Sequence, residues 1–254
     1  MVNMRTIFIL LILVNVLVSA CTKEDYKRTY TTEPVPVSPV VPPPPTVPLD
    51  TTAVKTYLAL GDSYTIGQSV SIEERFPNQV VSLLKQDTLV IDTAEIIART
   101  GWTTFDLFTR LTTNAPLKPT YDVVTLLIGV NNQFQRLSQS KYREEFGWLL
   151  DKAIIYAGKV RKNVIVLSVP DYGVTPFGMS LNAALISRQV DSFNIINKQI
   201  TLTEGCTYLD ITPSSREALT NPTLVATDGL HPSGAAYRKW AMLLAPIFKA
   251  VLKK

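Results

Sequence analysis

The sequence predicts an α/β protein, a three-layer α/β/α sandwich around a five-stranded parallel sheet. Short apolar runs alternate along the chain with longer segments whose apolar residues recur at helical spacing. Strands that alternate with helices pair in parallel through right-handed crossovers, so helices cover both faces of the sheet. The first fifty residues lack this pattern, and residues 54–254 are long enough to form one such domain.

The five predicted strands are short runs rich in Val, Ile and Leu. Such runs are typical of parallel strands that are buried on both faces. They span residues 56–60, 89–91, 123–128, 164–169 and 207–211.

The helical segments carry apolar stripes, which we interpret as faces turned toward the core. One stripe consists of Tyr142, Phe146, Leu149, Leu150 and Ala153, a second of Ile186, Val190, Phe193, Ile196 and Ile200, and a third of Tyr237, Ala241, Leu244, Ala245 and Phe248.

Residues 1–20 have the pattern of a signal peptide. Arg5 precedes an apolar run, residues 7–18, that is too short to span a bilayer. The run ends in Leu17-Val18-Ser19-Ala20-Cys21, which resembles the lipobox of bacterial lipoproteins. The resemblance implies cleavage before Cys21, lipidation of its thiol and a lipid-anchored location in the bacterial cell envelope. The alternative is an ordinary secretory signal followed by an incidental cysteine.

Residues 21–53 are expected to link this anchor to the folded domain. Eight prolines lie between residues 31 and 50, a composition that favours polyproline II and cannot build a core. We interpret the segment as a semi-rigid spacer.

The net charge bears on the class of partner, and the cysteine content bears on thiol chemistry. The 25 Lys and Arg residues barely exceed the 21 Asp and Glu residues, so nothing suggests a nucleic-acid partner. If Cys21 is lipidated, Cys206 is the only thiol left, and its apolar surroundings predict an inert buried side chain.

The candidate nucleophile follows the first predicted strand. Gly61-Asp62-Ser63 places a serine in a tight turn that enters a helix, at the strand end where open parallel sheets form their sites. A serine is a weak nucleophile until a base takes its proton.

His231 is the only histidine in the chain and hence the only candidate imidazole base. Asp228 precedes it by three residues, in a turn that contains Gly229, and can accept a hydrogen bond from Nδ1. That bond would leave Nε2 free to accept the serine proton. A lone histidine could instead cap the last helix, but the coincidence with the Gly61-Asp62-Ser63 turn favours catalysis.

Two further segments that follow strands offer donors for an oxyanion. Gly101 can bring its N–H close to a substrate because it has no Cβ, and Asn131 offers a side-chain amide. Either residue alone would be ordinary turn chemistry.

Together these segments resemble the SGNH/GDSL hydrolase family from Val54 to the C-terminus, which implies a flavodoxin-like sandwich. The resemblance implies that Ser63 is nucleophile and first oxyanion donor, that Gly101 and Asn131 are the other donors, and that His231 and Asp228 complete a triad. It also implies that Asp62 is a structural residue that bonds across the loops. One departure is visible, because the family often has Gly-x-Asn-Asp where this chain has Asn132 in the last position.

The loop at residues 168–177 also follows a strand and faces the predicted site. With Trp102 and Phe134 it either shapes the acyl or alcohol pocket or packs the loops together.

We therefore expect a serine esterase that needs no cofactor or metal. Its substrate would be a small-molecule, lipid or glycan ester, as for a lipase, lysophospholipase or short-chain acyl esterase. The alternatives are a carbohydrate O-acetylesterase with the same site, an acyltransferase, and a catalytically silent, membrane-tethered glycan-binding protein.

Overall fold

The computed structural model describes residues 54–86 and 89–253. The predicted signal peptide, the lipidation site Cys21 and the proline-rich linker lie outside these residues. Within them, no helix is both long enough and apolar enough to cross a bilayer.

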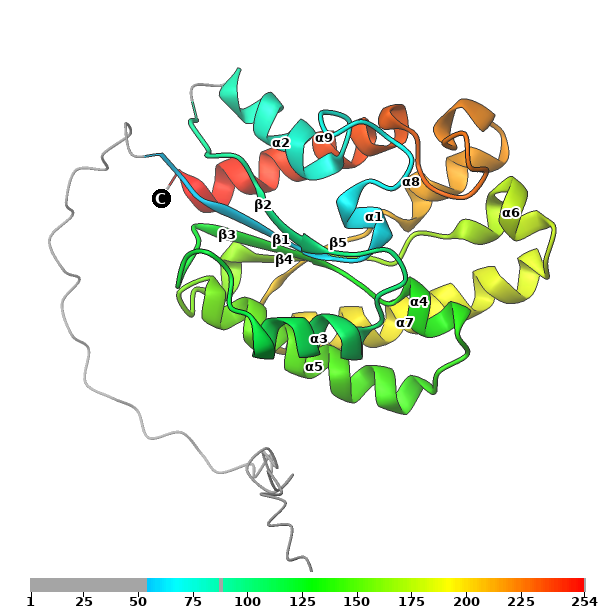
Figure 1. Cartoon of the computed structure of the whole chain (residues 1–254), viewed down its shortest axis with the longest axis horizontal. Coiled ribbons are helices and arrows are strands. Elements are labelled where there is room, and N and C mark those ends of the chain that lie inside the picture. Colours follow the sequence, from blue (N-terminus) through cyan, green and yellow to red (C-terminus); the bar gives the residue numbers. More distant parts are fainter. Residues whose placement is uncertain (1–53, 87–88, 254) are drawn as a thin grey trace, which may run out of the picture. The chain divides into compact units, whose positions relative to one another are not determined.

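Five strands form one parallel sheet in the order β2-β1-β3-β4-β5 (Figure 1). They are β1 (Tyr57–Gly61), β2 (Glu95–Ala98), β3 (Val123–Leu127), β4 (Val164–Leu167) and β5 (Thr207–Leu209). The predicted fold class and strand number are thus confirmed.

The prediction for the second strand was wrong. The run at residues 89–91 forms only an isolated bridge between Ile91 and Lys55, and β2 starts at Glu95. Both β2 and β5 are edge strands and only partly buried, so the prediction that all five strands are buried on both faces was also wrong. An edge strand tolerates polar residues, and β2 therefore lacks the continuous apolar run of a central strand.

Helices cover both faces of the sheet, as predicted. Figure 1 shows α2 (Phe76–Lys85) and α9 (Gly234–Leu252) on one side, and α3 (Thr104–Thr113), α5 (Gln139–Tyr156) and α7 (Ala183–Thr203) on the other. Shorter helices lie in the connections: α1 (Ser63–Ile66), α4 (Val130–Phe134), α6 (Pro176–Met179) and α8 (Thr212–Arg216).

The three predicted helical stripes pack into the core. All their members are buried except Ile200, which is partly buried. One apolar cluster lies between the sheet and the α2/α9 layer, and a second lies between the sheet and the α3/α5/α7 layer.

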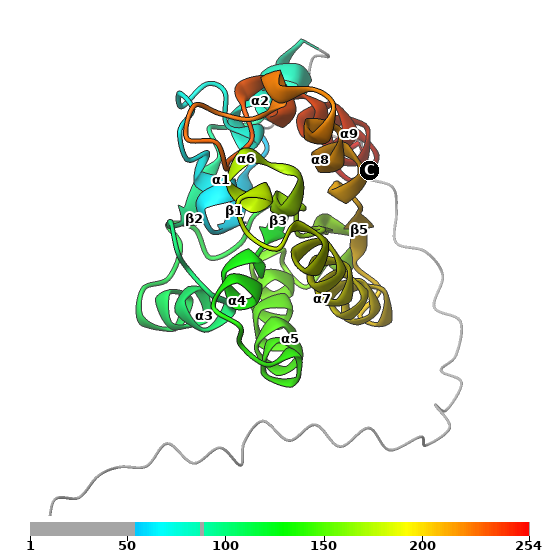
Figure 2. The ribbon, with the colours of Figure 1, turned by 90° about the vertical axis from the view of Figure 1, so that its right-hand side faces the viewer.

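The strand order determines which loops meet at the carboxyl edge of the sheet. Because β1 lies between β2 and β3, its last residue, Gly61, pairs with Ala98 on one side and Leu127 on the other. The loops that follow these three strands carry Ser63, Gly101 and Asn131. Figure 2 faces this end of the domain, where α1, α4 and α6 gather.

Candidate active site

Ser63 is the first residue of α1, directly after the central strand β1. Asp62 caps this short helix, because its Oδ1 accepts a hydrogen bond of 3.0 Å from Tyr64 N. The strand and the cap together hold the Ser63 hydroxyl at the middle of the carboxyl edge. The strand-to-helix turn predicted from the sequence is thus confirmed.

His231 lies against Ser63 although 168 positions separate them. The distance from His231 Nε2 to Ser63 Oγ is 3.0 Å, and that from Nδ1 to Asp228 Oδ2 is 2.7 Å. Both Ser63 and His231 are buried. The structure therefore brings the three predicted triad residues into one hydrogen-bonded row.

Asp228 is held by several donors at once. Its Oδ1 accepts the backbone N–H groups of Leu230 and His231, each at 2.9 Å. Its Oδ2 accepts the Ser69 hydroxyl at 2.6 Å in addition to the His231 ring. Partial burial alone would raise the pKa of Asp228, but the hydrogen bonds from Ser69 and His231 lower it well below its usual range. The carboxylate is thus ionised at neutral pH.

Ser69 is a member of the site that the sequence did not reveal. It lies 159 positions from Asp228 and belongs to no strand or helix, so no spacing rule links the two residues. Its backbone adopts a left-handed conformation, with φ of 67°. That conformation is uncommon for a residue other than glycine and is the one signal of a special role, visible only in the structure.

Two backbone N–H groups are free to act as donors at this site. Within the described part of the chain, Ser63 N and Gly101 N donate to no protein acceptor. Gly101 has φ of +85°, and a Cβ placed on it would project into open space. Glycine suits position 101 for two reasons: it adopts a positive φ without strain, and its missing Cβ leaves the backbone N–H accessible.

Asn131 reaches the same region from the first turn of α4. Gly129 begins this turn with φ of +132°, and a Cβ there would lie 2.8 Å from the Tyr142 hydroxyl. Asn131 Nδ2 donates one hydrogen bond of 2.9 Å to Trp102 O. An amide nitrogen carries two hydrogens, so this bond orients the group and leaves the second hydrogen available.

Asn132 faces away from this site into the protein. It is fully buried, its Oδ1 accepts from Thr104 N at 3.0 Å, and its Nδ2 donates to Thr104 Oγ1 at 2.6 Å. The departure from the family pattern thus falls on a residue that ties α4 to the start of α3.

The expectation that Asp62 bonds across the loops was wrong. Its Oδ1 contacts only the neighbouring Tyr64 N, and its Oδ2 has no hydrogen-bond partner among the described residues. Burial raises the pKa of Asp62 to about 7. Asp62 therefore caps only its own short helix, and the burial of its charged form is energetically unfavourable.

A pocket of about 130 Å³ opens beside Ser63 and His231. It is lined mainly by apolar side chains and by the segments that carry the candidate oxyanion donors. Its lining residues are Ser63, Tyr64, Thr100, Gly101, Val130, Asn131, Phe134, Tyr172, Phe177, Leu230 and His231. Phe134 and the 168–177 loop thus line the pocket, whereas Trp102 packs against the core.

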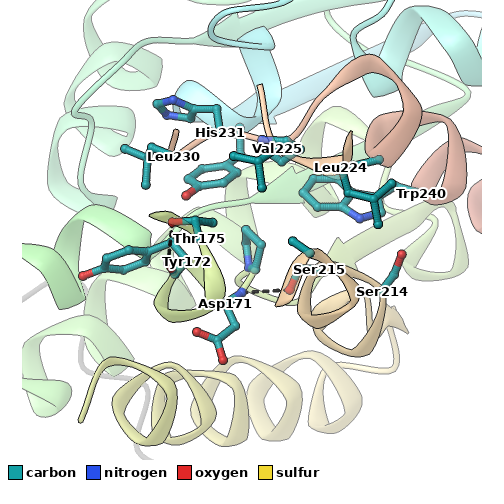
Figure 3. Close-up of a pocket in the computed structure, with 15 residues that line it drawn as sticks. Asp171, Tyr172, Thr175, Ser214, Ser215, Leu224, Val225, Leu230, His231 and Trp240 are labelled. Atoms are coloured by element: carbon teal, nitrogen blue, oxygen red, sulfur yellow. Dashed lines mark hydrogen bonds between the residues drawn. The ribbon is translucent and has the colours of Figure 1, made fainter. Parts of the chain in front are cut away.

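A second, much smaller cavity of about 20 Å³ lies behind this pocket, between His231 and Trp240 (Figure 3). Tyr64, Tyr172, Leu230 and His231 line both spaces and form the wall between them. In Figure 3 the His231 ring points away from the small cavity, in keeping with its contact to Ser63. The Asp171 carboxylate also points away from it, and Arg216 Nε lies 2.9 Å from Asp171 Oδ2.

Several solved structures share this fold. An acetylxylan esterase from Geobacillus stearothermophilus has a TM-score of 0.58 and 21% identity, over 79% of this chain and 94% of that one. A lipase from a goat rumen metagenome has a TM-score of 0.62 and 19% identity, over 76% and 97% of the two chains. A lipase/acylhydrolase from Enterococcus faecalis has a TM-score of 0.58 and 17% identity, over 78% and 96%.

A search of curated proteins by sequence finds no match. The sequence model of the GDSL-like lipase/acylhydrolase family, in contrast, matches residues 59–239, which include most of the sheet and the whole candidate triad. The chain therefore belongs to the GDSL-like lipase/acylhydrolase family and is a hydrolase that acts on ester bonds.

Proposed function

We propose that the protein is a serine esterase that prefers short acyl groups, with Ser63 as nucleophile, His231 as base and Asp228 as the residue that orients His231. The observation that carries the proposal is the row of hydrogen bonds from Ser63 Oγ through His231 to Asp228, with distances of 3.0 and 2.7 Å. These distances lie in the range that proton transfer between a nucleophile and its base requires.

In the proposed reaction, His231 Nε2 takes the Ser63 proton while Oγ bonds to the ester carbonyl carbon. The carbonyl π electrons move to oxygen, and the tetrahedral intermediate then expels the alcohol, which receives the proton from His231. In the second half, His231 deprotonates a water that attacks the acyl carbon. Ser63 leaves and regains its proton, and the carboxylic acid is released.

We propose three donors for the oxyanion: Ser63 N, Gly101 N and Asn131 Nδ2. Support comes from the two backbone N–H groups, which have no acceptor among the described residues, and from the Asn131 amide, whose orientation is set by its bond to Trp102 O. Donors that are already oriented before reaction stabilise the developing charge without reorganisation.

The size of the pocket supports the preference for short chains. A cavity of about 150 Å³ holds one benzene molecule, so a pocket of about 130 Å³ has room for an acyl group of roughly six carbons or fewer. A palmitoyl chain would exceed this volume, and Phe134, which lines the pocket, is half exposed to solvent.

The test is hydrolysis of p-nitrophenyl esters from acetate to palmitate by the purified protein and by Ser63→Ala. We expect kcat/KM to be highest for acyl chains of two to about six carbons and Ser63→Ala to lose activity by at least about 10³-fold. Ser192→Ala serves as the matched control, because in the part of the chain that the structure describes the Ser192 hydroxyl bonds only to its own helix, at Arg188 O. Full activity in Ser63→Ala would disprove the assignment.

A carbohydrate O-acetylesterase is the second candidate. The pocket has room for an acetyl group, and several of the similar structures are described as acetylxylan esterases. Release of acetate from acetylated xylan fragments, at a kcat/KM above that for p-nitrophenyl acetate, would favour this substrate class.

Acyl transfer and silent binding each have a separate test. Formation of methyl or sugar esters when an alcohol is supplied would indicate acyl transfer. A protein whose Ser63 does not react with a fluorophosphonate probe would be a silent binding protein.

We also propose that lipid at Cys21 anchors the protein in the bacterial cell envelope. The support is the Leu17-Val18-Ser19-Ala20-Cys21 motif after an apolar run. Lipidation would place the protein in the membrane fraction, and Cys21→Ser would release it into the soluble fraction. Equal partition of both forms would contradict the anchor.

A further inference from the structure

We propose that Glu145 is a positioning residue for the oxyanion site and acts through Thr104 and Asn132. The inference rests on the proposed function of Asn131 and Gly101 as oxyanion donors. It concerns a buried charge that the proposed mechanism does not otherwise use.

Glu145 lies in α5, and only 1% of its side chain is exposed. Its Oε2 accepts a hydrogen bond of 2.5 Å from Thr104 Oγ1. Its Oε1 has no hydrogen-bond partner among the described residues, and the nearest cation is Lys141 Nζ at 3.4 Å. Burial of a carboxylate with so few partners is costly, which points to a specific role.

The carboxylate determines the direction of the neighbouring hydrogen bonds. An ionised carboxylate only accepts, so the single hydrogen of the Thr104 hydroxyl goes to Glu145. The Thr104 oxygen must then accept from its other neighbour, the side chain of residue 132. Asn132 meets this requirement, because its Nδ2 lies 2.6 Å from Thr104 Oγ1.

The relay, defined as Asn132, Thr104 and Glu145, holds two parts of the site together. Asn132 is adjacent to Asn131, and Thr104 begins the helix that follows the Gly101 loop. Asn132 Oδ1 also accepts from Thr104 N at 3.0 Å. Two proposed oxyanion donors, Gly101 N and Asn131 Nδ2, therefore depend on the relay for their relative position.

The experiment reverses the direction of hydrogen-bond donation along the relay in two steps. In Asn132→Asp, two carboxylates compete for the single hydrogen of the Thr104 hydroxyl group, and the site should distort. In Asn132→Asp/Glu145→Gln the direction can invert, because the new amide at position 145 donates to Thr104 and Thr104 donates to the new carboxylate at position 132. Glu145→Gln alone keeps an acceptor toward Thr104.

We expect Asn132→Asp to lower kcat by at least about tenfold with a smaller change in KM, since small displacements of catalytic groups reduce turnover strongly. Its melting temperature should fall by about 5 °C or more. The double variant should regain kcat to within about threefold of the unmodified protein and most of the melting temperature. Glu145→Gln alone should lower kcat by a smaller factor, about three- to fivefold, because a neutral amide holds the Thr104 hydrogen less strongly than a carboxylate does.

The matched control is Asn132→Asp/Glu144→Gln. Glu144 is the exposed neighbour of Glu145 on α5, so its substitution removes the same charge without touching Thr104. We expect no rescue in this variant.

Additive losses in the double variant would overturn the relay. Rescue of the melting temperature without rescue of kcat would overturn the positioning role and leave a purely structural contact. If the unmodified protein hydrolysed no ester, the proposed function would fail, while the melting temperatures would still decide whether the relay exists.

Discussion

Ser69 donates a hydrogen bond of 2.6 Å to the same Asp228 oxygen that contacts the His231 ring. Asp228 therefore orients His231 while being held itself by a residue 159 positions away in the sequence. The contact also stabilises the ionised carboxylate and contributes to the lowered pKa of Asp228. Since Ser69 follows the helix that begins with Ser63, one short segment carries both the proposed nucleophile and the support for its proposed base.

Ser69→Ala should lower kcat about three- to tenfold, because a hydrogen bond to a charged group contributes roughly 1 kcal/mol when it is partly exposed. Loss of this bond raises the pKa of Asp228 and loosens the orientation of His231. The Ser69→Gly variant distinguishes the effect of losing the hydroxyl from the effect of backbone strain, since glycine adopts the φ of 67° without strain. We expect the same decrease in kcat in both variants. Full activity in Ser69→Gly would show that the decrease in Ser69→Ala comes from backbone strain instead of the lost hydrogen bond.

Asn131→Ala should lower kcat by about 10² to 10³ with little change in KM, the usual effect of losing one oxyanion donor. The substitution also removes the bond to Trp102 O, so a thermal unfolding measurement should accompany the kinetics. A fall in melting temperature with unchanged kcat would show that Asn131 is structural only.

Asp62→Asn should make the protein more stable, and increasingly so as the pH rises. Burial raises the pKa of the folded carboxyl to about 7, whereas the unfolded value is near 3.8. Between these values the unfolded chain is ionised and the folded chain is not, so stability falls as the pH rises from about 4 to 7 and stays low above that. At pH 8 the penalty amounts to a few kcal/mol, at about 1.36 kcal/mol per pKa unit.

Asparagine keeps the acceptor for Tyr64 N but carries no charge. The difference in melting temperature between Asp62→Asn and the unmodified protein should therefore be close to zero at pH 4 and reach several degrees at pH 8. A difference that does not change with pH would contradict the raised pKa of this buried carboxyl.

Cys206 should not react with a disulfide reagent at pH 8 in the folded protein. Its thiol is buried, and burial raises its pKa to about 11, so the reactive thiolate is scarce. In a Cys21→Ser chain, which leaves a single thiol, we expect no labelling before unfolding and one equivalent in guanidinium chloride. Rapid labelling of the folded chain would show that Cys206 is accessible.

The local pattern of the chain was enough to predict the fold class and the candidate triad. Tyr142 and Phe146 mark one turn of a buried helical stripe, and a short apolar run marks each central strand. These signals can be read from neighbouring residues, because each arises from the periodic contact of a single helix or strand with the core. Ser63 and His231 were found because the Gly61-Asp62-Ser63 turn needs a base and the chain has one histidine.

The edge strand β2 was misplaced because half-buried strands do not require continuous apolar residues. Glu145 gave no signal either, since a glutamate in a helix usually faces solvent. Only the packing of α5 against the start of α3 buries it beside Thr104.

By itself, the sequence predicted the fold class, the alternation of strands and helices, the candidate site residues and the edge of the sheet where they gather. The tertiary structure alone decided which distant groups contact them, such as Ser69 on Asp228, and how large the pocket beside Ser63 is. The reason is physical: periodicity records how one element meets the core, whereas a hydrogen bond between loops depends on where the whole chain places two backbones.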